Sequence, residues 1–200
     1  MAIIVDKEQK KKDIALACKS IIIENGINDL TIAKIAQTAG IGKGTFYEYF
    51  KSKEELLFEL VNILMHHHNI AQEQKLSKVQ STQEKIKIFA DFFYSEESID
   101  LRVLYKMFTG ISLLSPQNEM IDFQTECFNY YYQWFERLIE EGISKKEILP
   151  QTKLMAKGIF STAKGMFIAS ETTCSIDNLQ EEIELYIDTL FEFVSTKDSV

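Results

Sequence analysis

Residues 31–56 read TIAKIAQTAGIGKGTFYEYFKSKEEL, two short apolar repeats at helical spacing with a glycine between them. The first repeat begins after Thr31, which is a favourable helix cap, and it stops at Ala39-Gly40. Glycine adopts the left-handed backbone conformation that a tight turn between helices requires. The second repeat begins near Gly42. The spacing therefore predicts a helix-turn-helix.

The second helix of this motif has two different faces. At about 100° per residue, Phe46 and Phe50 point in one direction and are expected to face the core. The opposite face carries Gly44, Thr45 and Glu48, with Tyr47 and Tyr49 on either side of it. A helix of this kind fits the major groove of DNA, about 12 Å wide, where tyrosine hydroxyls suit phosphate oxygens.

Helix start and stop signals continue on both sides of the motif. We expect helices over residues 6–25, from the Ser52/Glu55 capping box through Leu64, from Ser81 to Tyr94, over 98–110, from Ser115-Pro116 to 141–142, from Pro150, and from Asp177 to Thr196. The prediction is an all-α chain of about nine helices. A helix-turn-helix head, residues 1–51, is joined by a long fourth helix to a helical body, residues 52–200.

Charge is unevenly spread along the chain. Residues 1–53 hold nine Lys and six acidic residues, whereas the remainder holds 13 basic and 24 acidic residues. The net charge of −8 argues against diffuse binding to nucleic acid or to anionic membranes, but a local basic face can still contact phosphate. No apolar run approaches the roughly 18 residues of a membrane span, and no signal peptide is recognisable. We expect a cytoplasmic protein without membrane contact.

The segment resembles the TetR family of bacterial transcriptional regulators. The resemblance covers about residues 6–60 and rests on Thr31, the run Gly42 to Tyr47, Phe50 and Lys53. It implies a homodimer that binds a palindromic double-stranded DNA operator through its head. It also implies a divergent body that binds a small-molecule inducer and thereby releases DNA, as a repressor does.

Family analogy also assigns the residues that contact DNA. They are Thr31, Lys43, Gly44, Thr45, Tyr47, Tyr49 and Lys53. The sequence departs from the family pattern at Tyr49, where histidine is frequent, and at Glu48, where an aromatic residue is frequent.

The helix expected around residues 120–139 is apolar over half of its circumference and is central to the body. Such an aromatic set forms either a solid core or a pocket, and the resemblance favours a pocket for an apolar or aromatic ligand. The candidate ligand-binding residues on this helix are Phe123, Cys127, Tyr130 and Trp134.

The last two expected helices are candidates for the dimer interface. The first carries a stripe of small residues, Gly158, Thr162, Gly165 and Ala169, and the second carries Ile183, Ile187, Leu190 and Val194. Glycine inside a helix costs about 1 kcal/mol relative to alanine, so two of them favour a close helix approach. The two helices either form a four-helix bundle with a second copy or close the core of one chain.

Other functions find little support in the sequence. It contains no phosphate-binding glycine loop, nucleophile elbow or zinc-ligand spacing, so we expect no enzyme, catalytic residue, metal or cofactor. Its three cysteines are not closely paired, which excludes a disulfide framework. An activator or architectural DNA-binding protein controlled by a protein partner remains an alternative to the repressor.

Overall fold

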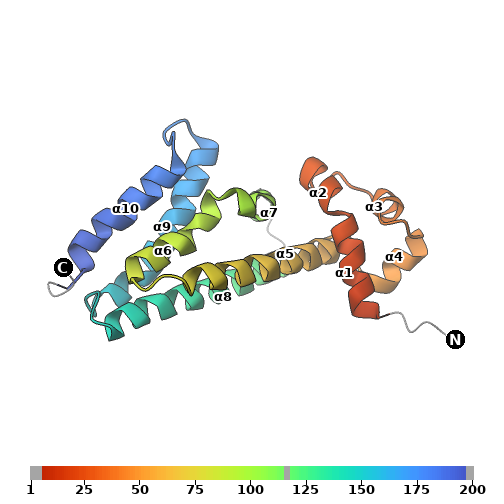
Figure 1. Ribbon diagram of the computed structural model, residues 1–200. Helices are drawn as coiled ribbons and strands as arrows, with labels where there is room; N and C mark the ends of the chain where they lie inside the picture. Colours follow the sequence, from red (N-terminus) through yellow and green to blue (C-terminus); the bar gives the residue numbers. More distant parts are fainter. Residues whose placement is uncertain (1–5, 115–117, 197–200) are drawn as a thin grey trace. The chain divides into compact units, whose positions relative to one another are not determined.

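A computed structural model describes residues 6–114 and 118–196 of the chain, and helices dominate it (Figure 1). In chain order the helices are α1 (Lys7–Ala17), α2 (Lys19–Asn25), α3 (Ile32–Thr38), α4 (Lys43–Tyr49), α5 (Lys53–Leu76), α6 (Thr82–Ala90), η1 (Asp91–Phe93), η2 (Glu96–Ser98), α7 (Ile99–Leu114), α8 (Asn118–Ser144), α9 (Thr152–Thr172) and α10 (Leu179–Val194). Over these two ranges the only β pairing is an isolated bridge between Ile148 and Ser195. The all-α prediction is confirmed.

Most of the predicted helix ends follow local capping. Thr31 and Ser81 accept hydrogen bonds from the backbone N–H groups of Lys34 and Glu84, as expected for N-caps. The helix predicted over 6–25 is instead interrupted at Cys18, whose N–H bonds three residues back to Ala15. The start predicted at Ser115-Pro116 lies outside the described residues. In α10 the cap is Asn178 rather than Asp177.

The chain divides into two compact units. One comprises residues 1–69 and 103–115, and the other residues 70–102 and 116–200. Helices α5 and α7 are continuous across these limits, so each contributes to both units. The functional boundary predicted between residues 51 and 52 stays a prediction. No helix in the described part of the chain has the length and apolar character needed to cross a membrane.

The core of the first unit is aliphatic with a few aromatic rings. Its fully buried side chains come from α1 to α5 and from the residue that follows α4: Ile14, Ile22, Ile35, Phe46, Phe50, Leu56, Leu57 and Leu60. Phe58 of α5 and Phe108 of α7 also pack together, with ring centroids 5.9 Å apart. The short helices α3 and α4 are therefore held by α1, α2 and the beginning of α5.

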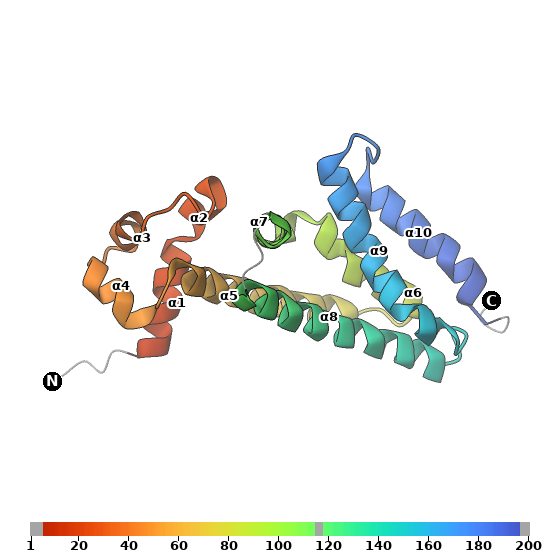
Figure 2. The ribbon, with the colours of Figure 1, turned by 180° about the vertical axis from the view of Figure 1, so that it is seen from behind.

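The core of the second unit is rich in aromatic rings. It is formed by α6, α8, α9 and α10, and both ribbon views show α9 and α10 side by side (Figures 1 and 2). Phe89 of α6 is central, because its ring lies 5.6 Å from the rings of both Trp134 and Phe135 and 6.2 Å from that of Phe160. Edge and tilted contacts of this kind add about 0.5–1.5 kcal/mol each beyond burial.

The turn after α8 ties three helices of the second unit together. The Glu147 carboxylate accepts the N–H of Thr82 at the start of α6 at 2.6 Å, and the Thr196 N–H, just beyond α10, bonds to the Glu147 carbonyl. Gly142 makes this approach possible, because a Cβ there would lie 2.5 Å from Thr82 Oγ1 and 3.1 Å from Ile148 Cδ1.

We expect Gly142→Ala to lower the free energy of unfolding by about 1–3 kcal/mol, since overpacking forces the Thr82 region to shift. Urea denaturation followed by circular dichroism measures the change. The matched control is Gly110→Ala in α7, where no neighbour within residues 6–114 and 118–196 comes within 4 Å of the added Cβ. There the better helix propensity of alanine should raise stability by up to about 1 kcal/mol. Equal effects of the two variants would contradict the assigned crowding.

Candidate nucleic-acid interface

Helices α3 and α4 form the predicted helix-turn-helix. After α3 the N–H of Gly40 bonds to the carbonyl of Gln37 at 3.1 Å, and the N–H of Ile41 bonds to that of Ala36 at 2.9 Å. This pair of bonds is a Schellman motif, and it places Gly40 in the left-handed region with φ +67°. Glycine is required at this position because a side chain would be strained there. The turn therefore fixes how α4 leaves α3.

The two phenylalanines of the motif set the orientation of α4. Phe46 and Phe50 are 0% and 1% exposed, and their ring centroids lie 5.5 Å apart. The opposite face is left to solvent: Gly44 and Glu48 are exposed, with the exposed Tyr47 and the half-buried Thr45 and Tyr49 beside them, and Lys43 is exposed as the first residue of the helix. The structure thus brings five of the predicted contact residues together on one helix. Thr31 is also exposed, at the start of α3.

The motif and the residues that follow it carry further exposed cations. Lys34 of α3 and Lys51, just after α4, are both exposed. These two lysines are not among the contact residues predicted from the sequence, although their places in and next to the motif are visible there. Together with Lys43 they supply positive charge for a polyanion such as DNA.

The first turn of α5 supports α4 from behind. Ser52 Oγ accepts the N–H of Glu55, and the Glu55 carboxylate accepts the N–H of Lys51 at 2.7 Å and the ammonium of Lys11 at 3.2 Å. Burial raises the pKa of Glu55, but these hydrogen bonds outweigh it and hold the pKa below its usual value. The Lys11 ammonium also lies 5.4 Å from the centroid of Phe50. Lys11 therefore fastens α1 to α5.

Lys53 differs from the other predicted contact residues. Its ammonium donates to the backbone carbonyls of Ile27 and Asn28, each at 2.8 Å, and of Leu30 at 3.3 Å. The side chain is half-buried and points into the first unit. No local signal in the sequence indicated this arrangement, because the partners lie more than 20 residues away.

The candidate interface residues of α9 and α10 divide into two groups. Gly158 and Gly165 are exposed, and no neighbouring side chain or element in the described part of the chain comes within 4 Å of a Cβ built at either; Thr162 and Ala169 are half-buried. Ile183, Ile187, Leu190 and Val194 are instead buried within this chain. The apolar residues that α10 leaves exposed are Leu185 and Phe193, at 62% and 75%. Leu154 of α9 is 89% exposed.

The candidate ligand residues occupy one side of α8. Trp134 is buried against Leu76 and Leu138, Tyr130 is 47% exposed, and Phe123 and Cys127 are half-buried. Burial raises the pKa of the Cys127 thiol to about 11, and the nearby Glu126 adds to the shift, so the thiol is uncharged at neutral pH.

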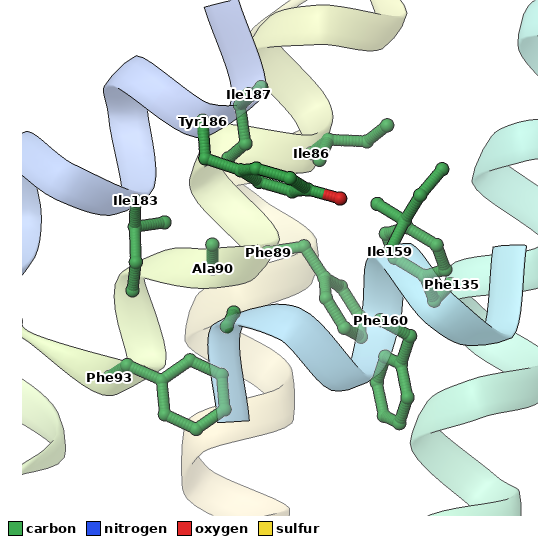
Figure 3. Close-up of a pocket in the computed structure, with 11 residues that line it drawn as sticks. Ile86, Phe89, Ala90, Phe93, Phe135, Ile159, Phe160, Ile183, Tyr186 and Ile187 are labelled. Atoms are coloured by element: carbon green, nitrogen blue, oxygen red, sulfur yellow. The ribbon is translucent and has the colours of Figure 1, made fainter. Parts of the chain in front are cut away.

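A small apolar cavity lies elsewhere in the second unit (Figure 3). Its volume is about 30 Å³, and it is lined by Ile86, Phe89, Ala90, Phe93, Phe135, Ile159, Phe160, Ala163, Ile183, Tyr186 and Ile187. None of the four candidate ligand residues lines this cavity. Phe135, which follows Trp134 in the sequence, does line it. Of the lining side chains only Tyr186 carries a polar atom, and Figure 3 shows its hydroxyl directed into the cavity.

Comparisons with known proteins agree with this architecture. The model of the family described as "Bacterial regulatory proteins, tetR family" matches residues 14–60. An uncharacterised HTH-type transcriptional regulator, YvdT of Bacillus subtilis, is 26% identical over 92% of this chain and 93% of the relative. The fatty acid metabolism regulator protein of the same organism is 27% identical over 78% of this chain and 80% of the relative. The structure of a TetR-family transcriptional regulator from Cytophaga hutchinsonii superposes with a TM-score of 0.79 at 12% identity, over 97% and 98% of the two chains.

An all-helical chain with an exposed, polar recognition helix, similar along most of its length to known regulators, is a helix-turn-helix transcriptional regulator that binds DNA. Its residues 14–60 match the TetR family of bacterial regulatory proteins, and its fold along most of the chain is that of a solved TetR-family regulator. Members of this family are transcriptional regulators and not enzymes.

We expect Tyr47→Ala to weaken binding to the protein's own DNA site by about 1–3 kcal/mol while leaving helicity unchanged, because the side chain is 51% exposed on the free face of α4. Electrophoretic mobility shift and circular dichroism measure the two quantities. Phe46→Ala is the control: it removes a fully buried ring and should cost about 3–5 kcal/mol of stability. Unchanged affinity of Tyr47→Ala would remove this residue from the interface.

Proposed function

We propose that the protein is a homodimeric repressor that binds a palindromic operator and is released from it by a small apolar or aromatic ligand. The observation that carries the proposal is the buried Phe46–Phe50 pair, because it leaves the opposite face of α4 free to enter a major groove. The head, residues 1–51, serves DNA binding in this proposal, and residues 52–200 serve ligand binding and dimerisation.

The proposed DNA contacts come from α4 and from the start of α3. Lys43 and Thr31 meet phosphates, and the hydroxyls of Tyr47 and Tyr49 meet phosphates on the two walls of the groove. Thr45 and Gly44 face the base edges. Among the described residues, no neighbour outside the adjoining helix backbone lies within 4 Å of a Cβ built at Gly44, so the missing side chain leaves room for a partner outside the protein. Lys53 is left out of this set because its ammonium is engaged with carbonyls.

The proposed dimer interface is the exposed surface of α9 and α10. Leu154, Gly158 and Gly165 recur on α9, and Leu185 and Phe193 lie eight residues apart on α10, so each helix exposes an apolar or small-residue stripe. Two such pairs form a four-helix bundle around a two-fold axis. The buried Ile183, Ile187, Leu190 and Val194 support this surface from inside the chain.

The proposed ligand site is the aromatic core of the second unit. The cavity has room for little more than a water molecule, so a larger ligand enters only when the lining helices separate. Such a ligand binds the arrangement with separated helices better than the closed arrangement. This difference is the condition for a ligand to shift DNA affinity. The lining favours an apolar molecule whose single polar group meets Tyr186. The relation to a regulator named for fatty acid metabolism supports an apolar ligand.

Selection from random duplex DNA with the purified protein tests the DNA-binding part. We expect one enriched sequence with two-fold symmetry and half-sites that fall on successive major grooves. An asymmetric or absent consensus would contradict the homodimeric, sequence-specific reading.

The selected duplex then serves to find the ligand. An apolar inducer should weaken DNA binding by about five- to 150-fold and change the fluorescence of Trp134, the only tryptophan, over the same concentration range. Phe89 lines the cavity and touches Trp134, so filling the cavity alters the surroundings of the indole. Ile159→Phe should raise the required concentration, and Ile121→Phe, at an exposed position of α8, should not. Release with unchanged fluorescence would place the ligand elsewhere.

Gly165→Leu tests the interface. The variant should fold, because the position is exposed with open space around it, but it should sediment as a monomer and lose operator binding. Glu73→Leu adds the same side chain at an exposed position of α5 and should leave association unchanged. Analytical ultracentrifugation distinguishes the two outcomes, and a dimeric Gly165→Leu would refute the assignment of α9.

A further inference from the structure

The ammonium of Lys53 is fully engaged inside the first unit. A lysine ammonium has three N–H donors and no acceptor. The three carbonyls of Ile27, Asn28 and Leu30 lie at 2.8, 2.8 and 3.3 Å, so each donor has a backbone partner. A phosphate oxygen would have to displace one of these carbonyls. The geometry therefore opposes direct use of this ammonium as a DNA ligand.

The three carbonyls belong to the segment that leads into the helix-turn-helix. The segment begins after Gly26, where α2 ends with φ +73°, and it finishes at Thr31, the N-cap of α3. Ile27 and Leu30 are 1% and 7% exposed, so their side chains anchor the segment to the core. Lys53 anchors its backbone. Because Lys53 is the first residue of α5, the start of α3 is fixed to the start of α5.

The arrangement separates Lys53 from the lysines at the DNA-facing surface. Lys43 stands at the start of α4 with an exposed side chain, whereas Lys53 is half-buried and bonded to the segment before α3. We propose that Lys53 is a positioning residue for DNA recognition: it sets the placement of α3, and through the Gly40 turn that of α4, without contributing a phosphate contact of its own.

The salt dependence of DNA binding distinguishes a positioning residue from a phosphate ligand. Each phosphate contact contributes about 0.9 to the slope of log K against log salt concentration. With the DNA duplex selected by the wild-type protein, Lys53→Met should lower affinity by about tenfold or more and leave the slope unchanged. Lys43→Met is the matched control and should reduce the slope by about 0.9 for each bound copy.

Hydrogen exchange in the free protein gives a second readout that needs no DNA. The amides of Lys34 and Ile35 bond to the side chain and carbonyl of Thr31, so they report on the start of α3. Lys53→Met should accelerate their exchange, and Lys43→Met should not. Lys53→Gln, which is neutral but retains two N–H donors, should fall between wild type and Lys53→Met in exchange rate and affinity, with the slope unchanged.

A reduced slope for Lys53→Met, with unchanged exchange at Lys34 and Ile35, would overturn the proposal and make Lys53 a phosphate ligand. Unchanged exchange together with unchanged affinity would also overturn it. If Lys53→Met does not fold, Lys53→Gln decides the question by the same two measurements. If the wild-type protein selects no DNA sequence, the repressor proposal fails, while the exchange measurement still decides whether Lys53 positions α3.

Discussion

The burial of Phe46 and Phe50 is the constraint on which the recognition surface depends. Helix α4 has seven residues, and a helix this short is not stable in water by itself. Its stability comes from two aromatic rings one turn apart, both buried in the first unit. Because the side chains of a helix are fixed around its axis, burying these two also determines which residues remain outside. Stability and recognition are thus set by one contact.

A second constraint acts at the first turn of α5. Glu55 holds Lys11 of α1 and the N–H of Lys51, and Lys53 holds the segment before α3. Helix α1, the Lys51 backbone after α4 and the segment before α3 are therefore all held by the first turn of α5. The Schellman turn at Gly40 then determines the position of α4 relative to α3. The rigidity that a reading helix needs is supplied by charged hydrogen bonds behind it and by buried rings beneath it.

Local signals explain how much of this could be predicted. The caps at Thr31 and Ser81, the turn glycine and the Phe46–Phe50 spacing act over a few residues, so the sequence contains both partners of each interaction within one turn or two. The break at Cys18 and the carbonyl partners of Lys53 could not be predicted. Those features depend on which segments meet in three dimensions, and helical periodicity carries no information about this.

The same limit applies to the body. Periodicity showed that α10 has an apolar face, and Ile183 and Leu190 do lie on one, but it could not say whether a second copy or the chain itself covers that face. On α8, Trp134 and Phe135 are adjacent residues on an apolar face that covers half of the circumference, and only packing decides that Phe135 lines the cavity. Apolar character was predictable, whereas the identity of the neighbour was not.

Because the cavity is small, binding of the proposed ligand has a consequence for α9 and α10. A molecule larger than water must separate α6 from α9 and α10, since these helices supply most of the lining. Asp188 of α10 opposes this movement, because it accepts hydrogen bonds from Lys87 and Gln83 of α6 at 2.5 and 2.7 Å. The bond from Lys87 holds the pKa of Asp188 below its usual value, so the carboxylate stays charged at neutral pH. Any ligand that opens the core therefore moves α6 relative to α9 and α10, the helices whose outer faces are proposed to pair two copies of the chain.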